Sequence, residues 1–143
     1  MSRESEVPLE ALFGSSGIAA LATLKHDGRP QLSNIVYSYD PRERTFSVSI
    51  TDTRAKTRNM RRDPRVSVFV DSRDGWSYAV AEGHAELSDV AADPHDTTVD
   101  ELVALYRAVQ GDHPDWDEFR DAMVDEGRLL LRVRVERFYG IAR

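Results

Sequence analysis

The chain has 143 residues, of which 41% are hydrophobic, and its formal net charge is −6, which fits an acidic, folded protein with one domain over residues 1–143. The absence of cysteine excludes disulfides, thiolate metal sites and a cysteine nucleophile, and it is compatible with the cytoplasm. The first residues do not combine a basic start with a long apolar run, and no run approaches the roughly eighteen apolar residues of a membrane span, so we expect neither export nor membrane insertion.

Six segments alternate apolar and polar residues in the way that is typical of half-buried strands. The first two, about 18–25 and 31–39, flank a turn at Asp27-Gly28 and form a hairpin. The other four segments are 45–50, 66–70, 76–87 and 128–141. The pattern predicts a mainly β (α+β) protein whose core is an antiparallel barrel of about six strands with short helices.

A short helix is expected between the third and fourth strands, over residues 54–62. Thr51, Asp52 and Thr53 precede it as candidate N-caps. It should end near residue 63, because Pro64 disfavours a helical residue before it.

Two further helices are expected before the last strand. Thr98 and Glu101 have the spacing of a capping box at the start of the first, which ends before Gly111. Trp116 marks the second, which ends near Gly127. The apolar stripes of both helices are typical of core packing and contain no cofactor motif.

The helix over 54–62 lies in a segment with a high concentration of positive charge. Six cations fall within twelve positions: Arg54, Lys56, Arg58, Arg61, Arg62 and Arg65. With Asp63 included, residues 54–65 carry a net charge of +5, which leaves −11 on the rest of the chain. We therefore expect no general affinity for nucleic acid, and a small anion as the partner instead. The helix N-terminus adds about half a positive charge and free N–H groups, which makes residues 51–56 a candidate phosphate site. Alternatively, the cations are solvated or pair with the acidic stretch 86–106.

Polar and aromatic side chains in the strands are further candidates. Gln31, Ser33 and Asn34 lie inside a strand, where they either face solvent or hydrogen-bond a ligand. Trp76 and Tyr78 share one face of the fifth strand and either wall a planar ring or pack the barrel interior. The four histidines lack metal-ligand spacing, and the sequence has no GxSxG, GxGxxG or P-loop motif, so we expect no metal site and no hydrolase or nucleotide-kinase chemistry.

Three segments, LATLKHDGRPQLSNIVYSYD, TRAKTRNMRRDPRVSVFVD and DGWSYAVAEGHAEL, together resemble the pyridoxamine 5′-phosphate oxidase-like family, specifically the actinobacterial branch that uses the deazaflavin coenzyme F420. The similarity runs from about Leu9 to Tyr139, and R-x-K-x-R-N-x-x-R-D-P is its most specific part. The resemblance implies a split β-barrel homodimer, like FMN-binding proteins, with one cofactor in each of two clefts at the subunit interface. Since such a cofactor carries the hydride chemistry, no catalytic side chain is expected.

The resemblance also assigns residues to the cofactor. The family positions that contact it fall on Asn34, Ser49, Arg54, Lys56, Arg58, Asn59, Trp76, Ser77 and Tyr78. The motif residues would hold the phosphate and nearby groups, and the segment 76–78 would come from the other subunit. Arg58, Arg61 and Arg62 exceed what one phosphate needs, and we expect them to attract the oligoglutamate tail of F420.

We therefore expect an enzyme that transfers hydride from reduced F420 to an unsaturated organic small molecule. Two alternatives stay open at this point: an FMN-dependent oxidase or reductase on the same fold, and a non-catalytic F420 carrier. True pyridoxamine phosphate oxidase activity is less favoured, because the family's C-terminal substrate-phosphate cations have no clear match in RVERFYGIAR.

Overall fold

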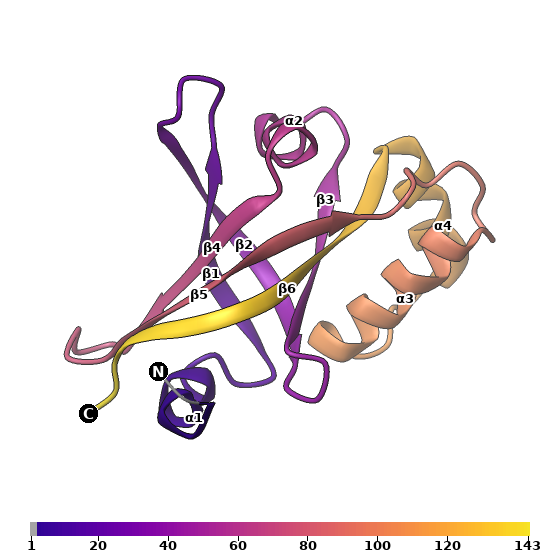
Figure 1. Ribbon diagram of the computed structural model, residues 1–143. Coiled ribbons are helices and arrows are strands. Elements are labelled where there is room, and N and C mark those ends of the chain that lie inside the picture. Colours follow the sequence, from indigo (N-terminus) through magenta and orange to yellow (C-terminus); the bar gives the residue numbers. More distant parts are fainter. Residues whose placement is uncertain (1–2) are drawn as a thin grey trace.

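The computed structural model describes residues 3–143, and its centre is a closed antiparallel barrel with the strand order β1-β2-β3-β6-β5-β4 (Figure 1). The strands are β1 (Ser16–Leu24), β2 (Pro30–Asp40), β3 (Thr45–Thr51), β4 (Arg65–Asp71), β5 (Tyr78–Leu87) and β6 (Arg128–Ile141). The barrel predicted from the sequence is confirmed, although the fifth strand begins two residues later than the alternation suggested. Every described strand is paired on both sides over at least part of its length, so none of the six is a free edge strand.

The interior of the barrel is filled by the inward-facing residues of each strand. Leu21, Phe46 and Val68 are fully buried there, from β1, β3 and β4. In β6, Leu131 points inward as expected, whereas Leu130 points outward and is nevertheless buried, because helices cover that part of the barrel wall. One strand therefore supplies both the barrel core and a second, smaller core.

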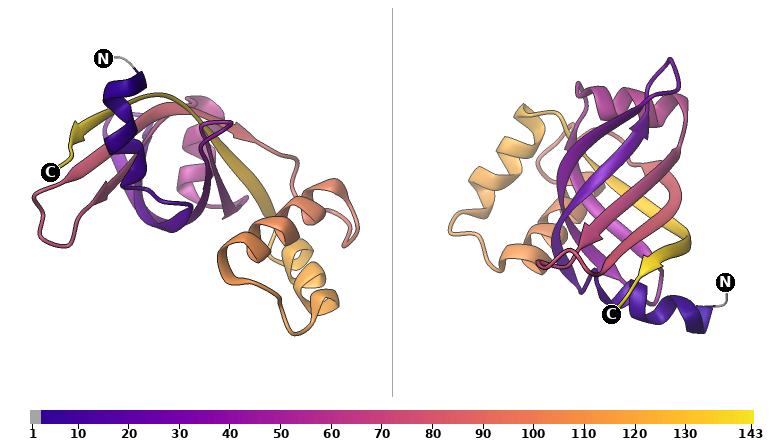
Figure 2. Two further views of the ribbon diagram at one scale, coloured as in Figure 1. Left: turned by 90° about the horizontal axis from the view of Figure 1, so that it is seen from below. Right: turned by 90° about the vertical axis from the view of Figure 1, so that its left-hand side faces the viewer.

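Four helices surround the barrel: α1 (Arg3–Ala11), α2 (Ala55–Arg62), α3 (Thr97–Gln110) and α4 (Trp116–Asp125). Figures 1 and 2 show α2 and α1 at opposite ends of the barrel, while α3 and α4 pack together against its side. Of residues 3–143, no helix is both long enough and apolar enough to cross a membrane.

The helix starts differ from the predicted caps. For α2, the N-cap is Arg54, whose side chain makes no capping hydrogen bond, so the predicted caps at 51–53 are wrong. The capping box at the start of α3 is also wrong, because Asp96 accepts the N–H of Val99 at 2.8 Å. The hydroxyl of Thr98 donates instead to the carbonyl of Asp89. It is not needed as a cap, since the carboxylate of Asp96 already accepts the N–H of Val99. The predicted end of α2 at residue 63 is confirmed.

Helix α1 was not predicted from the sequence, and its contacts explain why it forms. Its Glu6 is buried and accepts hydrogen bonds from the N–H of Phe138 at 3.1 Å and from Arg44 at 3.0 Å. Tyr39 donates a hydrogen bond to Glu10 of the same helix. These contacts join residues far apart in the sequence, so the local sequence pattern does not predict the helix.

Candidate functional site

The barrel is split between β2 and β3. Their ladder joins only residues 38–40 to residues 45–47. Beyond it, β2 remains paired with β1 as far as Pro30, and β3 remains paired with β6 as far as Thr51. The two strands therefore diverge and leave a gap in the wall of the barrel, below α2.

A cavity of about 380 Å³ lies at this split, and we call it the β2–β3 cleft. Its barrel side includes three of the predicted cofactor residues, Asn34, Ser49 and Lys56. Its other side is formed by α3 and α4. The lining consists of Asn34, Ile35, Val36, Val48, Ser49, Lys56, Leu102, Leu105, Tyr106, Val109, Gln110, Phe119, Met123 and Arg128.

Lys56 is the main cation of the cleft, and it has no carboxylate partner among residues 3–143. Its ammonium donates to the hydroxyl of Ser33 at 3.4 Å, and the side chain is partly buried. Burial lowers the pKa of Lys56, and the nearby charges of Arg54 and Arg128 lower it further. A half-buried ammonium beside two other cations is stabilised by an anionic ligand.

The N-terminus of α2 adds hydrogen-bond donors next to Lys56. Arg54 contributes no side-chain cap, so the first turn of the helix has no side-chain acceptor. Its own guanidinium is exposed and makes no hydrogen bond or ion pair within the described part of the chain. Backbone N–H groups and two cations at one helix start form the kind of site that binds phosphate groups.

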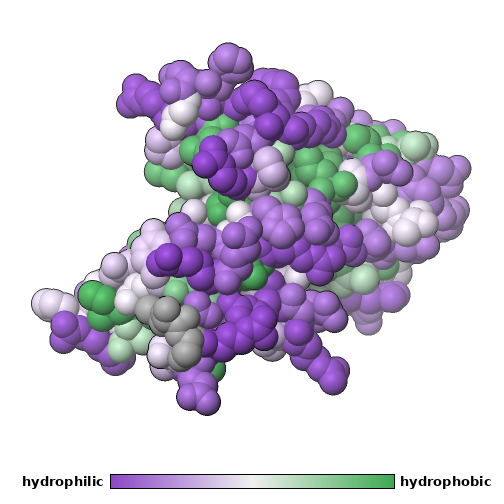
Figure 3. Space-filling view, in the orientation of Figure 1, coloured by the Kyte–Doolittle hydropathy of each residue, from purple (hydrophilic) through white to green (hydrophobic). Residues whose placement is uncertain are grey.

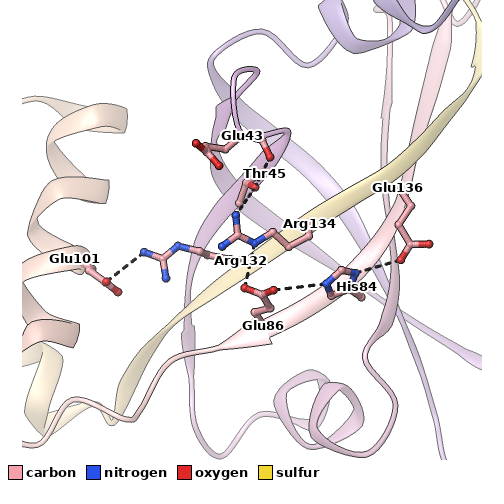
Figure 4. Close-up of polar contacts among 8 residues, drawn as sticks. All are labelled: Glu43, Thr45, His84, Glu86, Glu101, Arg132, Arg134 and Glu136. Carbon is pink, nitrogen blue, oxygen red and sulfur yellow. Dashed lines mark hydrogen bonds and ion pairs between the residues drawn. The ribbon is translucent and has the colours of Figure 1, made fainter. Parts of the chain in front are cut away.

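The other four cations of the segment have partners inside the protein. These are the carbonyl of Thr53 for Arg58, Asp52 for Arg61, the carbonyl of Leu24 for Arg62, and Asp63 for Arg65. The alternative of pairing with the acidic stretch 86–106 is therefore wrong for the ion pairs that the structure describes. Glu86 and Glu101 of that stretch pair with Arg134 and Arg132 of β6 (Figure 4). Binding of Arg58, Arg61 and Arg62 to a cofactor tail stays a prediction.

Asn59 lies inside the protein, only 8% exposed. Its amide nitrogen donates to Thr23 at 3.1 Å, and its amide oxygen accepts from Arg62 at 3.2 Å. Thr23 in turn donates to Gln31 at 3.0 Å. The side chain thus ties α2 to the β1–β2 hairpin and fixes the helix that carries Lys56; cofactor contact by Asn59 stays a prediction.

The segment 76–78 lies away from the cleft within one chain. It follows the end of β4, whereas α2 precedes the start of β4, so the length of the strand separates them (Figure 1). Trp76 is 67% exposed, and the interpretation that it packs the barrel interior is therefore wrong. Ser77 is buried, and its hydroxyl accepts the N–H of Arg143 at 2.9 Å. Tyr78 lies with its ring centroid 6.1 Å from that of Phe69.

Comparison with known proteins gives a direct result for this chain. Residues 8–142 match the family model described as pyridoxamine 5′-phosphate oxidase. The chain belongs to this pyridoxamine 5′-phosphate oxidase family. The family resemblance and the split-barrel fold expected from the sequence are thus confirmed, and with them a general oxidoreductase-type family.

Three solved structures of similar fold illustrate the range of proteins that this chain resembles. An F420 reductase is 27% identical with a TM-score of 0.66, and the alignment covers 91% of this chain and 94% of that one. A conserved hypothetical protein from Mycobacterium tuberculosis is 24% identical with a TM-score of 0.72, over 99% and 85% of the two chains. A heme binding protein from Mycobacterium smegmatis is 23% identical with a TM-score of 0.63, over 99% and 55%. The last two likenesses show the fold alone.

Some cleft residues of this family member were missed from the sequence. Arg128 faces the split because it pairs with Thr51 at the end of β3, a pairing between strands far apart in the chain. Tyr106, Val109 and Phe119 belong to the apolar stripes of the two helices, which the sequence indicated only as core packing. Their partial exposure toward a cavity depends on how α3 and α4 dock, which periodicity does not encode. Within residues 3–143, no group of His, Asp or Glu side chains could hold a metal ion.

Proposed function

We propose that this protein is an oxidoreductase that binds coenzyme F420 in the β2–β3 cleft and delivers hydride to an unsaturated organic small molecule. The observation that carries the proposal is the uncompensated ammonium of Lys56 beside the uncapped start of α2. The 27% identity to an F420 reductase supports the deazaflavin over FMN. A cytoplasmic location, expected from the absence of cysteine, belongs to the same proposal.

Different residues in and beside the cleft would bind different parts of the cofactor. Arg54, Lys56 and the first N–H groups of α2 would hold the phosphate, while Asn34 and Ser49 offer hydrogen bonds elsewhere along the barrel side of the cleft. When bound, a deazaflavin supplies the hydride that the chain's own side chains do not carry. The protein then contributes orientation and exclusion of water, and Arg58 and Arg61 lie on an exposed face where a carboxylate tail is attracted.

We further propose a homodimer in which the segment 76–78 of a second copy completes each cleft. An apolar face on the outside of β1, β2 and β4 supports this, since Ile18 is 70% exposed and Leu32 is 69% exposed. Ile18 lies directly opposite Val36 in the β1–β2 ladder, and Phe69 of β4 continues the face. By contrast, the side drawn in Figure 3 is mainly hydrophilic, apart from a hydrophobic band between α2 and the α3–α4 pair. Exposed apolar side chains on three neighbouring strands fit contact with a second copy of the chain.

The dimer is tested by placing charge on this face. We expect sedimentation velocity to show a dimer at micromolar concentration, and Ile18→Asp to shift it to monomer, because two carboxylates would be buried at the twofold interface. Val7→Asp is the matched control, since Val7 is also exposed and apolar but lies on α1. A parent protein that stays monomeric while it binds cofactor would remove the shared-cleft proposal.

Titrating the purified protein with F420 and with FMN under identical conditions tests the cofactor. We expect F420 to bind at least about tenfold more tightly, which corresponds to roughly 1.4 kcal/mol. Tighter binding of FMN would instead support the FMN-dependent alternative. Tight F420 binding without reduction of any acceptor would support a carrier protein.

The affinity for F420 should fall as pH rises, and the fall should begin at a lower pH than for a site with an ordinary, exposed lysine. Only the protonated ammonium of Lys56 attracts the phosphate, and burial already lowers the pKa of Lys56 in the free protein. Bound phosphate raises the pKa of Lys56 again. At a pH between the pKa of the free protein and that of the complex, binding therefore takes up a proton, and the affinity falls as the pH rises through this range. Calorimetric titrations from pH 7 to about pH 10 should show this slope, and Lys56→Met should abolish it. A flat profile in the parent would mean that Lys56 does not meet the anion.

A further inference from the structure

The two sides of the β2–β3 cleft differ in chemistry. Among the described residues that line it, the charged side chains are Lys56 and Arg128, and both lie on the barrel side. The opposite side comes from α3 and α4, and none of its described residues carries a charge. Gln110 lines it at the end of α3, and we call the other six residues the apolar wall: Leu102, Leu105, Tyr106, Val109, Phe119 and Met123. A ligand in the cleft therefore meets the charged groups on the barrel side and mainly apolar side chains on the helix side.

Aromatic rings hold the apolar wall in shape. Tyr106 of α3 and Phe119 of α4 meet edge to face, with their ring centroids 5.1 Å apart. Trp116 packs on both, at 5.7 Å from Tyr106 and 5.6 Å from Phe119. The guanidinium of Arg107 lies 4.7 Å from the centre of the Trp116 ring. Such a cluster keeps the two helices at a fixed spacing.

The wall is also fixed to the barrel. Glu101 of α3 pairs with Arg132 of β6 at 3.2 Å. Figure 4 shows the two side chains pointing toward each other from the helix and the strand. Val99 of α3 and Leu130 of β6 are both buried in the hydrophobic cluster beneath the helices. These contacts attach α3 to β6 and so fix the apolar wall beside the cleft.

We infer that the apolar wall is the substrate side of the cleft and that it selects flat, uncharged, apolar acceptors. The inference rests on the proposed function, because that proposal places the cofactor at the polar side. A planar ring gains contact with the exposed parts of Tyr106 and Phe119. A charged acceptor would lose hydration against a surface whose described residues carry no opposite charge and on which the hydrogen-bonding side chains are Tyr106 and Gln110.

The experiment uses 1,4-naphthoquinone as a flat, uncharged probe. Trp116 reports on it, because this ring packs on two wall residues, and quenching of its fluorescence gives the affinity. The Trp116→Phe variant identifies the part of the signal that comes from the other tryptophan. Covalent reaction of the quinone with thiols is excluded, since the chain has no cysteine. Affinity is measured in the full chain, with and without F420.

The test pair is Leu105→Asn with Val109→Asn, one helical turn apart on the wall. The matched control is Ala104→Asn with Ala108→Asn, the same spacing on the exposed face of α3. We expect the wall pair to weaken naphthoquinone binding at least about tenfold, which is 1.4 kcal/mol, and the control pair to change it less than twofold. Val109→Phe, which keeps the wall apolar and fills the cleft, should weaken binding to a similar extent.

The two proposals fail in different ways. If the wall and control pairs have equal effects on naphthoquinone, the wall does not select the acceptor. If the wall pair weakens F420 as strongly as naphthoquinone, or if naphthoquinone displaces F420, the wall belongs to the cofactor side and the inference is overturned. If the parent does not bind F420, the proposed function is contradicted instead. Quenching of tryptophan fluorescence by naphthoquinone in the cofactor-free protein then still measures binding to the apolar wall.

Discussion

Replacing Lys56 with alanine should weaken F420 binding by about 1.5 to 3 kcal/mol, the usual contribution of a hydrogen bond to a charged group. The side chain is half-buried in the β2–β3 cleft, where its attraction for an anion is screened less than at an open surface. Within residues 3–143 its ammonium makes one long hydrogen bond, to Ser33, and no ion pair, so its removal should leave the fold intact. Fluorescence titration of the variant and the parent with F420 measures the difference.

Lys25→Ala is the matched control, because Lys25 and Lys56 are the two lysines of the chain. Both substitutions remove one positive charge, but Lys25 is exposed and lies in the turn after β1. Equal weakening by the two variants would show that net charge, rather than the cleft, governs binding. Lys56→Arg should restore part of the affinity if charge at that position is what the phosphate meets.

The barrel was predictable because its information is local. Alternation in segments such as 45–50 and 128–141 predicts that every second residue lies inside, and Phe46, Val48 and Leu131 are buried accordingly. The split was not derivable in this way. It arises because the β2–β3 ladder stops at Ser38 and Ser47, and a strand pattern does not state how far two strands stay paired.

The candidate site was predictable only in part for the same reason. The cations of 54–62 are adjacent in sequence, and the helix that carries them forms where expected. Their separate roles depend on distant partners: Arg62 reaches the carbonyl of Leu24, and Asn59 reaches Thr23. The apolar wall was equally invisible, because Tyr106 has the spacing of a core residue whether or not a cavity lies beside it.

Helix α1 gives the clearest case of structure fixed by distant contacts. Its Glu6 is 8% exposed in its side chain and pairs with Arg44, which is 14% exposed, in the turn between β2 and β3. Arg44 has a positive φ of 49° and lies with its guanidinium 5.4 Å from the centre of the Phe138 ring. The same carboxylate accepts the N–H of Phe138. One buried side chain thus joins the helix, a turn and β6.

We expect Glu6→Ala to lower the free energy of unfolding by about 3 to 5 kcal/mol, the cost of removing one partner of a buried ion pair. Arg44 would keep a buried charge without a counter-ion, and the N–H of Phe138 would lose its acceptor. Urea unfolding measures the loss, and Glu4→Ala, exposed on the same helix, should change stability by less than about 0.5 kcal/mol. Glu6→Ala combined with Arg44→Ala should recover part of the loss, because the uncompensated charge is gone. If the double variant is as unstable as the sum of the single ones, Glu6 acts through the Phe138 N–H and the packing of α1 rather than through Arg44.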